Sequence, residues 1–520
     1  MSTGGRQIRR AALQVVALFV VSRLLGLLRE VVIGAAFGTS AEYDAYLAAI
    51  TIPDILFTLI AGGALGSAFI PTFTGYLARG DAAGAWRLAS GVVNLLVLVL
   101  LGATALAWLG APLLVSTVLV PGFSPSQQAL TASLMRVMLL APLCFGVSGV
   151  VMGILNARQH FILPALTPSF LNLALIGAAW LAAPRLGVRA LAWGYLAGAL
   201  LHLLVQLPGL YWVGARYNLR LNVRDPGIRQ VLKLMAPRVL GLAAVQLNFV
   251  VNKNIASWFG AGAVSALNYA WLLMLLPQGV FAQAVATAAF PTFADQVARG
   301  KRDELRHSLV STLRTVFFLC IPAAVGLLVL GRPFVAALFE RGAFGAASTE
   351  AVAWALSLYA LGLVGHAGIE IVARGFYALH DTWTPVWVGG AAMGVNVVAS
   401  LALSAVFARA GLPPHGGLAL ANSLAALLEM AWLLVRIRSR IGGLEGRALL
   451  RSTAQSGLAA GVMAAVLVTC QLLLPSVPPV LLAAGGIVLG AAVYLLVAYL
   501  LRAEELALVR RLFLKRLQRG

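Results

Sequence analysis

Long runs of apolar residues, separated by short polar segments, extend along the whole chain. A transmembrane helix needs about 20 consecutive apolar residues, and each run is at least roughly that long. Several runs contain glycine or proline, which membrane helices tolerate. The pattern predicts fourteen membrane-spanning helices, near residues 11–38, 44–77, 88–119, 128–155, 161–183, 189–213, 230–260, 264–297, 307–330, 350–378, 384–408, 416–436, 450–474 and 478–501.

The amino-acid composition indicates the same class of protein. Of the 520 residues, 61% are hydrophobic and only 11% are charged, and the mean hydropathy is +0.92. A soluble protein of this length needs more polar surface. The sequence therefore predicts an all-α integral membrane protein.

The cysteines and histidines give no sign of a cofactor. Cys144, Cys320 and Cys470 all lie in apolar runs, as small core residues do, and the six histidines are scattered without a His-x-x-x-His pair. We therefore expect neither a disulfide framework nor a metal site, and no cofactor.

Charge predicts the orientation of the helices. The formal net charge is +21. If the N-terminus is cytoplasmic, most lysines and arginines fall in cytoplasmic segments, including the terminal run at 510–520, as the positive-inside rule requires. This placement favours cytoplasmic N- and C-termini and argues against nucleic acid as the partner of the basic charge. The opposite loops hold only Arg185, Arg189, Arg332, Arg341 and Arg409.

The chain contains an internal repeat. SRLLG at 22–26 corresponds to PRVLG at 237–241, and IPTFTGYLARGD at 70–81 corresponds to FPTFADQVARGK at 290–301. Both copies begin after a basic segment, so they share one orientation, as repeats related by an axis along the membrane normal do.

The repeat predicts the domain organisation. Residues 1–215 form an N-lobe of helices 1–6, residues 216–440 form a C-lobe of helices 7–12, and residues 441–520 hold helices 13–14 and a basic cytoplasmic tail. Two parallel six-helix lobes can enclose a cleft that opens to either side of the membrane. This organisation is typical of a transporter.

The first predicted helix carries charge at membrane depth. Arg23 and Glu30 are seven residues apart and share a face, whereas Arg29 lies about 120° from Arg23. Such residues usually face a polar cavity or a partner. Two interpretations stay open: Arg23 and Arg29 line a cavity, or they reach an interface or pair with Glu30 or Asp44 as a structural lock.

The second copy has its own charged positions. Arg238 matches Arg23, and Lys253 lies in the apolar stretch FVVNKNIASWF, where it contacts substrate or a counter-ion unless it is hydrated or paired. Arg374 is a further cavity candidate, although pairing with Glu370 at i−4 is the simpler interpretation. Asp54 and Glu429 are the remaining acids within helices.

The motifs resemble those of the MurJ/MviN family, lipid II flippases of the multidrug/oligosaccharidyl-lipid/polysaccharide exporter superfamily. The segment at 374–386 is specific to that family, and the resemblance covers helices 1–12. The matching segments are VSRLLGLLREVVIGAAFG, YDAYLAAITIPDIL, GGALGSAFIPTF, GILNARQHFILPALTPSFLNLALIG and RGFYALHDTWTPV.

The resemblance implies a flippase that moves the undecaprenyl-diphosphate-linked peptidoglycan precursor from the cytoplasmic to the outer leaflet by alternating access, for cell-wall synthesis. In that family, a cationic central cavity holds the diphosphate-sugar head of the substrate. The matching positions here are Ser22-Arg23, Arg29-Glu30 and Asp44. The arginine fork suits a diphosphate because it makes two parallel charge-assisted hydrogen bonds.

Two departures leave open which lipid-linked substrate is carried. Phe57 and Thr58 stand where the family usually has a basic pair, and Gly62 or Gly63 replaces an acid. Leu272 occupies the position of a cavity arginine in helix 8. Lys253 is the candidate for partial replacement of the lost charge.

Other functions stay open at this stage. The chain could export another lipid-linked saccharide or an amphipathic drug, or serve as an inactive cell-wall scaffold; a membrane glycosyltransferase is disfavoured because the outer loops offer few acids. We expect a monomeric, multi-pass protein of the bacterial plasma membrane, with the lipid-linked precursor, membrane lipids and cell-wall synthesis proteins as candidate partners. The coupling ion and any role of the membrane potential stay open.

Overall fold

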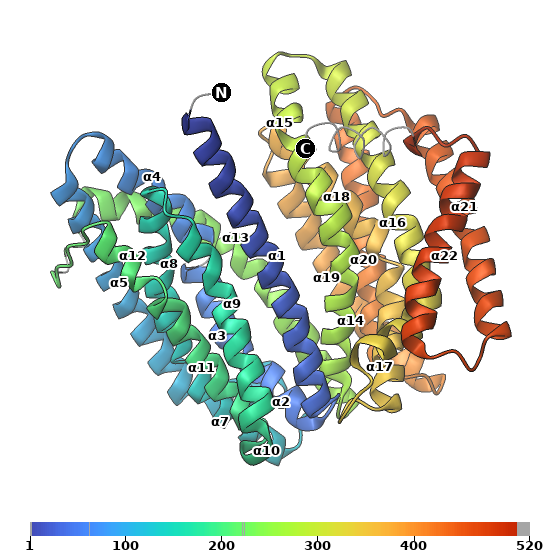
Figure 1. Ribbon diagram of the computed structural model, residues 1–520, viewed down its shortest axis with the longest axis horizontal. Helices are drawn as coiled ribbons and strands as arrows, with labels where there is room; N and C mark the ends of the chain where they lie inside the picture. The colour runs from blue at the N-terminus through green and yellow to red at the C-terminus, as the bar shows by residue number, and fades with distance from the viewer. Residues whose placement is uncertain (1–2, 62, 221, 223, 507–520) are drawn as a thin grey trace. The chain divides into compact units, whose positions relative to one another are not determined.

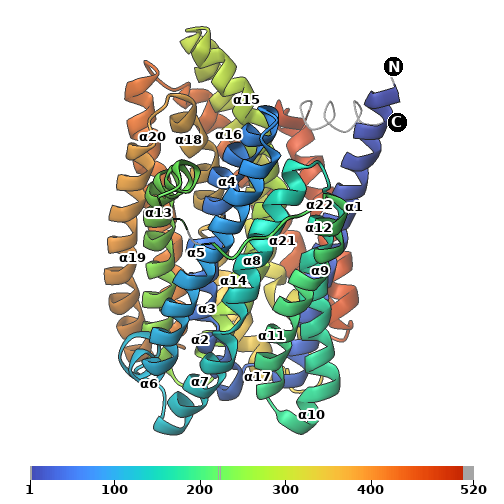
Figure 2. The same ribbon diagram turned by 90° about the vertical axis from the view of Figure 1, so that its left-hand side faces the viewer.

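The computed structural model describes residues 3–61, 63–220, 222 and 224–506; the side chains at 3–13, 60–61, 63–67, 237–238, 240–241 and 244–245 are outside this description. Every regular element in the described ranges is a helix (Figures 1 and 2). The chain divides into two compact units. Unit 1 comprises Met1–Val264 and Arg341–Phe344, and unit 2 comprises Ser265–Glu340 and Gly345–Gly520.

Unit 1 holds the first thirteen α-helices, and three π-helical turns and one 3₁₀ turn interrupt or follow them. The elements are α1 (Thr3–Phe37), α2 (Ala41–Ala49), α3 (Thr51–Leu56), the π turn η1 (Phe57–Ala61), α4 (Gly63–Ala78), α5 (Ala82–Leu109), α6 (Ala111–Leu113), the π turn η2 (Leu114–Leu119), α7 (Pro125–Met138), α8 (Ala141–Ala157), α9 (Ile162–Gly177), the π turn η3 (Ala178–Ala182), α10 (Ala183–Leu186), α11 (Arg189–Leu204), α12 (Leu207–Trp212), α13 (Pro226–Ala256) and the 3₁₀ turn η4 (Ser257–Phe259).

Side-chain caps and aromatic packing organise unit 1. Ser40 and Asp81 accept backbone N–H bonds at the starts of α2 and α5, where the first turn of a helix has unsatisfied donors. The core between α4, α5 and α8 is built around Phe69 and Phe73, both fully buried, and Phe73 meets the edge of Trp86. Helix α1 packs along α9, and α8, α9 and α11 lie side by side (Figure 1).

The rest of the helices lie in unit 2, apart from the first two residues of α14. They are α14 (Ala263–Pro277), the π turn η5 (Gln278–Gln283), α15 (Ala284–Ala298), α16 (Arg302–Phe339), α17 (Ala346–Ala360), α18 (Leu363–Ala378), α19 (Trp383–Arg409), α20 (His415–Arg440), α21 (Gly446–Leu473) and α22 (Pro479–Leu500). Helix α16 contacts α15, α17, α18, α21 and α22, so it is the central helix of this unit.

The structure agrees with most of the predicted spans. Within the described residues, ten helices are long and apolar enough to cross a membrane, or eleven if α17 and α18, bent by 45°, form one span. All eleven coincide with predicted spans. The other three, at 11–38, 44–77 and 230–260, are also largely helical but carry most of the charged residues discussed above. The total of fourteen stays a prediction.

The two copies of the repeat have the same local backbone where their sequences are most similar. In the first copy the π turn η1 precedes α4, which contains Pro71; in the second the π turn η5 precedes α15, which contains Pro291. Two residues after the end of each helix lies a glycine with positive φ, Gly80 at 76° and Gly300 at 70°. In each, the glycine N–H and the next N–H bond back to the last helical turn, as in a Schellman motif.

The last two helices attach to α16 through buried polar bonds as well as apolar packing. Arg314 on α16 pairs with Glu505 at 2.6 Å and with Glu504 at 2.7 Å, just beyond the end of α22. The Glu505 side chain is only 3% exposed and also accepts from Ser452 of α21 at 2.8 Å. The Tyr494 hydroxyl donates to the Phe318 carbonyl at 2.7 Å. These bonds fix α21 and α22 to unit 2.

The predicted lobes and the compact units describe different properties. The lobes follow the sequence repeat, whereas the units group residues by packing, and α13 packs on α4 within unit 1. The lobe boundaries at 215 and 440 therefore stay a prediction. Cys144, Cys320 and Cys470 are free; Cys320 is buried, and Cys144 and Cys470 are half-buried.

Candidate functional site

Polar side chains from six helices of unit 1 gather within the apolar helical bundle. They come from α1, α2, α3, α9, α11 and α13. We call this group the polar cluster, and it comprises Arg29, Glu30, Tyr43, Tyr46, Thr51, Asp54, Asn172, Tyr195 and Lys253.

Arg29 and Glu30 form the first part of the cluster. The Arg29 guanidinium donates through Nε to Glu30 at 3.1 Å and through a second nitrogen to the same carboxylate oxygen. A third nitrogen donates to Asn172 Oδ1 at 3.1 Å. The Tyr43 hydroxyl lies 3.4 Å from the other oxygen of Glu30. Glu30 is buried, whereas the Arg29 side chain stays 26% exposed.

Lys253 of α13 forms the second part. Its ammonium donates to the Leu47 carbonyl and to the Thr51 hydroxyl, both at 2.8 Å. These acceptors lie on either side of Ile50, where α2 ends and α3 begins. A lysine at membrane depth needs such partners, because an unpaired charge there is costly. Lys253 therefore has a structural role, and its half-buried side chain still carries a positive charge beside the break.

Asp54 joins the cluster through Tyr195. The Tyr195 hydroxyl of α11 donates to Asp54 Oδ1 at 2.7 Å. Asp54 also interacts electrostatically with Lys253 and Arg29, which are cations of two different helices. The sequence identified Asp54 as an acid within a helix but gave no reason to place it beside these two.

Three other predicted positions lie elsewhere. Asp44 is completely buried and accepts the Gly262 N–H at 2.6 Å, so its carboxylate ties the start of α2 to the turn before α14. Arg23 is exposed on α1. The Arg238 side chain lies outside the described residues, although its backbone belongs to α13.

Arg374 lies in unit 2, at a separate hollow. It donates to the Glu370 carbonyl at 2.8 Å and pairs with the Glu370 carboxylate, which is the i, i+4 pair expected from the spacing. A hollow of about 460 Å³ between α15 and α18 is lined by both residues and by Phe290, Ile369, Ala373 and Tyr377. Arg374 thus makes the helix pair and lines a hollow at once.

The structure describes Phe57 and Leu272, one residue from each departure from the family pattern. Phe57 packs against Phe145 of α8, with ring centroids 5.0 Å apart. Leu272 of α14 is half-buried.

Sequence reasoning missed Asn172, Tyr43 and Tyr195 as partners of the charged residues. The available signal was their chemistry, since an amide or hydroxyl in an apolar run needs a partner. Asn172 in FLNLALIG is the clearest case, and its Nδ2 donates to the Ser22 carbonyl at 3.1 Å. Only the fold could identify which residue each one meets.

The polar cluster can bind an anion but offers no metal centre. Among the residues that the structure describes, no group of three or more His, Cys, Asp or Glu side chains could hold a metal ion. A guanidinium has five N–H donors, and the three described bonds of Arg29 leave two for a ligand. A phosphate oxygen suits these donors because it accepts charge-assisted bonds.

Comparisons with known proteins agree with one another. The family model described as lipid II flippase MurJ matches residues 33–496. The lipid II flippase MurJ of Burkholderia cenocepacia is 36% identical over 441 residues, which cover 83% of this chain and 84% of the relative. The probable lipid II flippase MurJ of Rhizobium tropici is 32% identical over 505 residues, covering 94% and 93%.

Solved structures give the same result at the level of the fold. The lipid II flippase MurJ in its inward closed conformation superposes with a TM-score of 0.78 at 26% identity, covering 94% of this chain and 98% of that one. A multidrug resistance MATE family transporter of the MOP superfamily, in an inward-facing conformation, has a TM-score of 0.64 at 17% identity, with 83% and 99% covered. The second similarity concerns the fold alone.

Proposed function

This chain belongs to the lipid II flippase MurJ family, and we propose that it moves lipid II, the undecaprenyl-diphosphate-linked peptidoglycan precursor, from the cytoplasmic to the outer leaflet of the plasma membrane. The proposed activity is transport by alternating access, with no covalent chemistry. It supplies precursor for cell-wall synthesis.

The observation that carries this proposal for the chain's own residues is the partly exposed Arg29 side chain within the apolar helical bundle. Glu30 neutralises it when no ligand is bound, which lowers the cost of holding a charge there. A diphosphate is a stronger anion with more acceptor oxygens, so it competes with Glu30 for the same fork. Binding and release then exchange one partner of Arg29 for another.

Other charged residues are candidates to assist Arg29 in binding the polar head of the substrate. We assign Lys253 a supporting role, in which its positive charge beside the α2–α3 break partly replaces the basic pair that Phe57 and Thr58 displace. Arg374 at its hollow is a second candidate contact for the polar head. Arg23 and Arg238 stay candidates on the sequence argument, and Asp44 stays a candidate only if its buried bond to Gly262 opens.

Further features of the proposal come from the sequence. They are cytoplasmic N- and C-termini, two repeat lobes at 1–215 and 216–440 with helices 13–14 after them, a monomer, and lipid partners with cell-wall synthesis proteins as additional ones. The proposal includes no cofactor and leaves the membrane potential and a monovalent ion as the two candidate driving forces of the cycle.

The experiment is complementation in a bacterium depleted of its own lipid II flippase. We expect the wild-type chain to restore growth and Arg29→Ala to fail. Arg136→Ala is the matched control, because Arg136 is also an arginine of a unit 1 helix but donates to the Trp108 carbonyl, at 3.2 Å, and lies over the Trp108 ring. Membrane levels of all variants are compared by fluorescence-detected size exclusion.

The outcomes separate function from site. If the well-inserted wild type does not restore growth, the flippase assignment is wrong. If wild type and Arg29→Ala restore growth equally, the function stands and the role of Arg29 is refuted. An equal loss in Arg136→Ala would show that any helix arginine is needed for insertion, which also refutes the specific role.

A further inference from the structure

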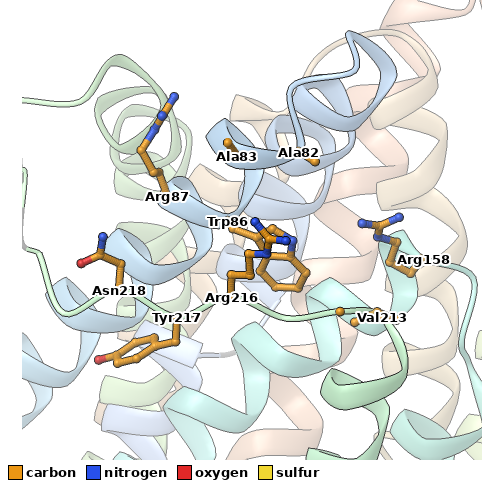
Figure 3. Close-up of a pocket in the computed structure, with 10 residues that line it drawn as sticks. Ala82, Ala83, Trp86, Arg87, Arg158, Val213, Arg216, Tyr217 and Asn218 are labelled. Atoms are coloured by element: carbon orange, nitrogen blue, oxygen red, sulfur yellow. The ribbon is translucent and has the colours of Figure 1, made fainter.

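A second hollow, separate from the polar cluster, lies at one end of unit 1. It has a volume of about 480 Å³ and is lined by three arginines from three elements. Arg87 comes from the first turns of α5, Arg158 follows α8, and Arg216 follows α12 (Figure 3). The floor includes Trp86, which is only 8% exposed.

The segment after α12 is fastened to α5, so the position of Arg216 is set by the fold. The buried Ser90 hydroxyl accepts the Asn218 N–H at 3.0 Å and lies 3.5 Å from the Arg216 carbonyl. One turn further along α5, Asn94 donates to the Asn218 carbonyl at 3.0 Å and accepts from the Tyr217 hydroxyl. Arg216 and the two residues that follow it are thereby bonded to one helix.

The hollow is strongly cationic. None of the residues that line it is acidic, and the Asp81 carboxylate, which caps α5, lies 4.0 Å from Arg87. The first turn of α5 also lines the hollow through Ala82 and Ala83, and a helix N-terminus carries partial positive charge. Three arginines held around one space suit a phosphate, whose oxygens accept from several guanidinium groups at once.

The surroundings of the hollow resemble the surface zone of a membrane. Tyr211, Trp212, Tyr217 and Leu219 are 87%, 64%, 62% and 80% exposed. Aromatic residues with one polar and one apolar end are enriched at the level of lipid headgroups. All three arginines also lie in segments that the charge distribution assigns to the cytoplasmic side, where anionic lipids gather.

We propose that this hollow binds the phosphate of an anionic membrane lipid, with Arg87, Arg158 and Arg216 around the headgroup and the exposed aromatic residues beside the acyl chains. A lipid headgroup and free phosphate share the anionic phosphate group. The exposed residues Tyr211, Trp212, Tyr217 and Leu219 favour the lipid, because acyl chains can pack against them. The site is independent of the polar cluster and of the transport proposed above.

The test is native mass spectrometry of the delipidated full-length protein titrated with phosphatidylglycerol, phosphatidylcholine or inorganic phosphate. The variant is Arg87→Gln/Arg158→Gln/Arg216→Gln. The control, Arg436→Gln/Arg438→Gln/Arg447→Gln, removes the same charge from exposed arginines that are also predicted to be cytoplasmic but line no described hollow. Thermal unfolding of each variant without lipid checks the fold.

We expect phosphatidylglycerol to bind the wild type and the control alike, and the hollow variant at least about tenfold more weakly, because each basic residue near anionic lipid contributes several-fold to binding. If the triple variant does not fold, the single Arg216→Gln variant should still bind about fivefold more weakly. Equal binding by the hollow variant overturns the site. Binding of inorganic phosphate as strong as that of the lipid, or of phosphatidylcholine as strong as that of phosphatidylglycerol, overturns the anionic-lipid assignment.

Discussion

Replacing Arg314 should loosen the last two helices from α16. Arg314 carries two ion pairs whose partners differ sharply in exposure: Glu505 is 3% exposed and Glu504 is 76% exposed. In Arg314→Ala the buried Glu505 keeps only Ser452, at 2.8 Å, as a described partner for its carboxylate. An uncompensated buried charge is the main cost of such a change.

The magnitude follows from that difference in burial. Breaking a buried ion pair by removing one partner costs about 3–5 kcal/mol, and the Arg314 side chain, itself 18% exposed, places this pair near the lower value. For a unit of this size about 3 kcal/mol corresponds to a fall in Tm of roughly 6–12 °C. The assay is thermal unfolding in detergent at a fixed scan rate, because membrane proteins often unfold irreversibly.

The adjacent acids supply the control. Glu505→Ala should approach the effect of Arg314→Ala, whereas Glu504→Ala should cost at most about 1 kcal/mol, as exposed pairs do. The double variant Arg314→Ala/Glu505→Ala should be less destabilised than the sum of the single variants, since it leaves no buried charge. Equal effects of the two glutamate variants, or additive single effects, would refute the reasoning.

Three further predictions concern single positions. Gly262→Ala should lower Tm, because φ is +90° and the new Cβ would lie 2.7 Å from the Thr39 carbonyl oxygen; a Tm equal to wild type would contradict this. Tyr195→Phe removes a donor to a carboxylate and should destabilise by about 1.5–3 kcal/mol in the same unfolding assay, and a smaller loss would show that the bond is weak. The Thr384 backbone N–H, helped by the Thr384 hydroxyl and by Arg440, holds the pKa of Asp381 below its usual value. The stability gained from that carboxylate is therefore present above the pKa of the unfolded chain, about 3.9, and is lost as the pH falls through the lower folded value. Asp381→Asn should accordingly lower Tm at pH 7 and progressively less below pH 4, and a Tm difference independent of pH would refute this.

The sequence predicted the helical segments well because spanning length and apolarity leave few alternatives in a bilayer. It also predicted a local similarity that the structure contains. The Pro-Thr-Phe and Ala-Arg-Gly motifs occur in both copies, and the copies are 220 residues apart. In each copy the last glycine, Gly80 or Gly300, forms the same backbone turn. That turn depends on a glycine with positive φ, which is a local property of the sequence.

Contacts between helices were harder to predict. Helical periodicity places Arg23 and Glu30 on one face, yet Arg23 is exposed and Glu30 is buried beside Arg29 and Tyr43. The periodicity of one helix does not specify how far its neighbours extend along it. Lys253 is a similar case, since its acceptors, the Leu47 carbonyl and the Thr51 hydroxyl, lie on α2 and α3, about 200 residues earlier in the chain.

The π-helical turns have a consequence for how the two copies tolerate insertions. A π turn closes its hydrogen bond one residue later than an α turn, so it holds an extra residue without ending the helix. In an α-helix each residue advances the direction of the side chain by about 100°. Deleting one residue from η1 can therefore convert the π turn into an α turn and leave Phe69 and Phe73 in their buried positions, whereas a deletion in the regular helix before them would turn both side chains by about 100°. In the second copy the π turn η5 likewise precedes the proline-containing helix α15, so each copy has a turn that can absorb a one-residue insertion or deletion.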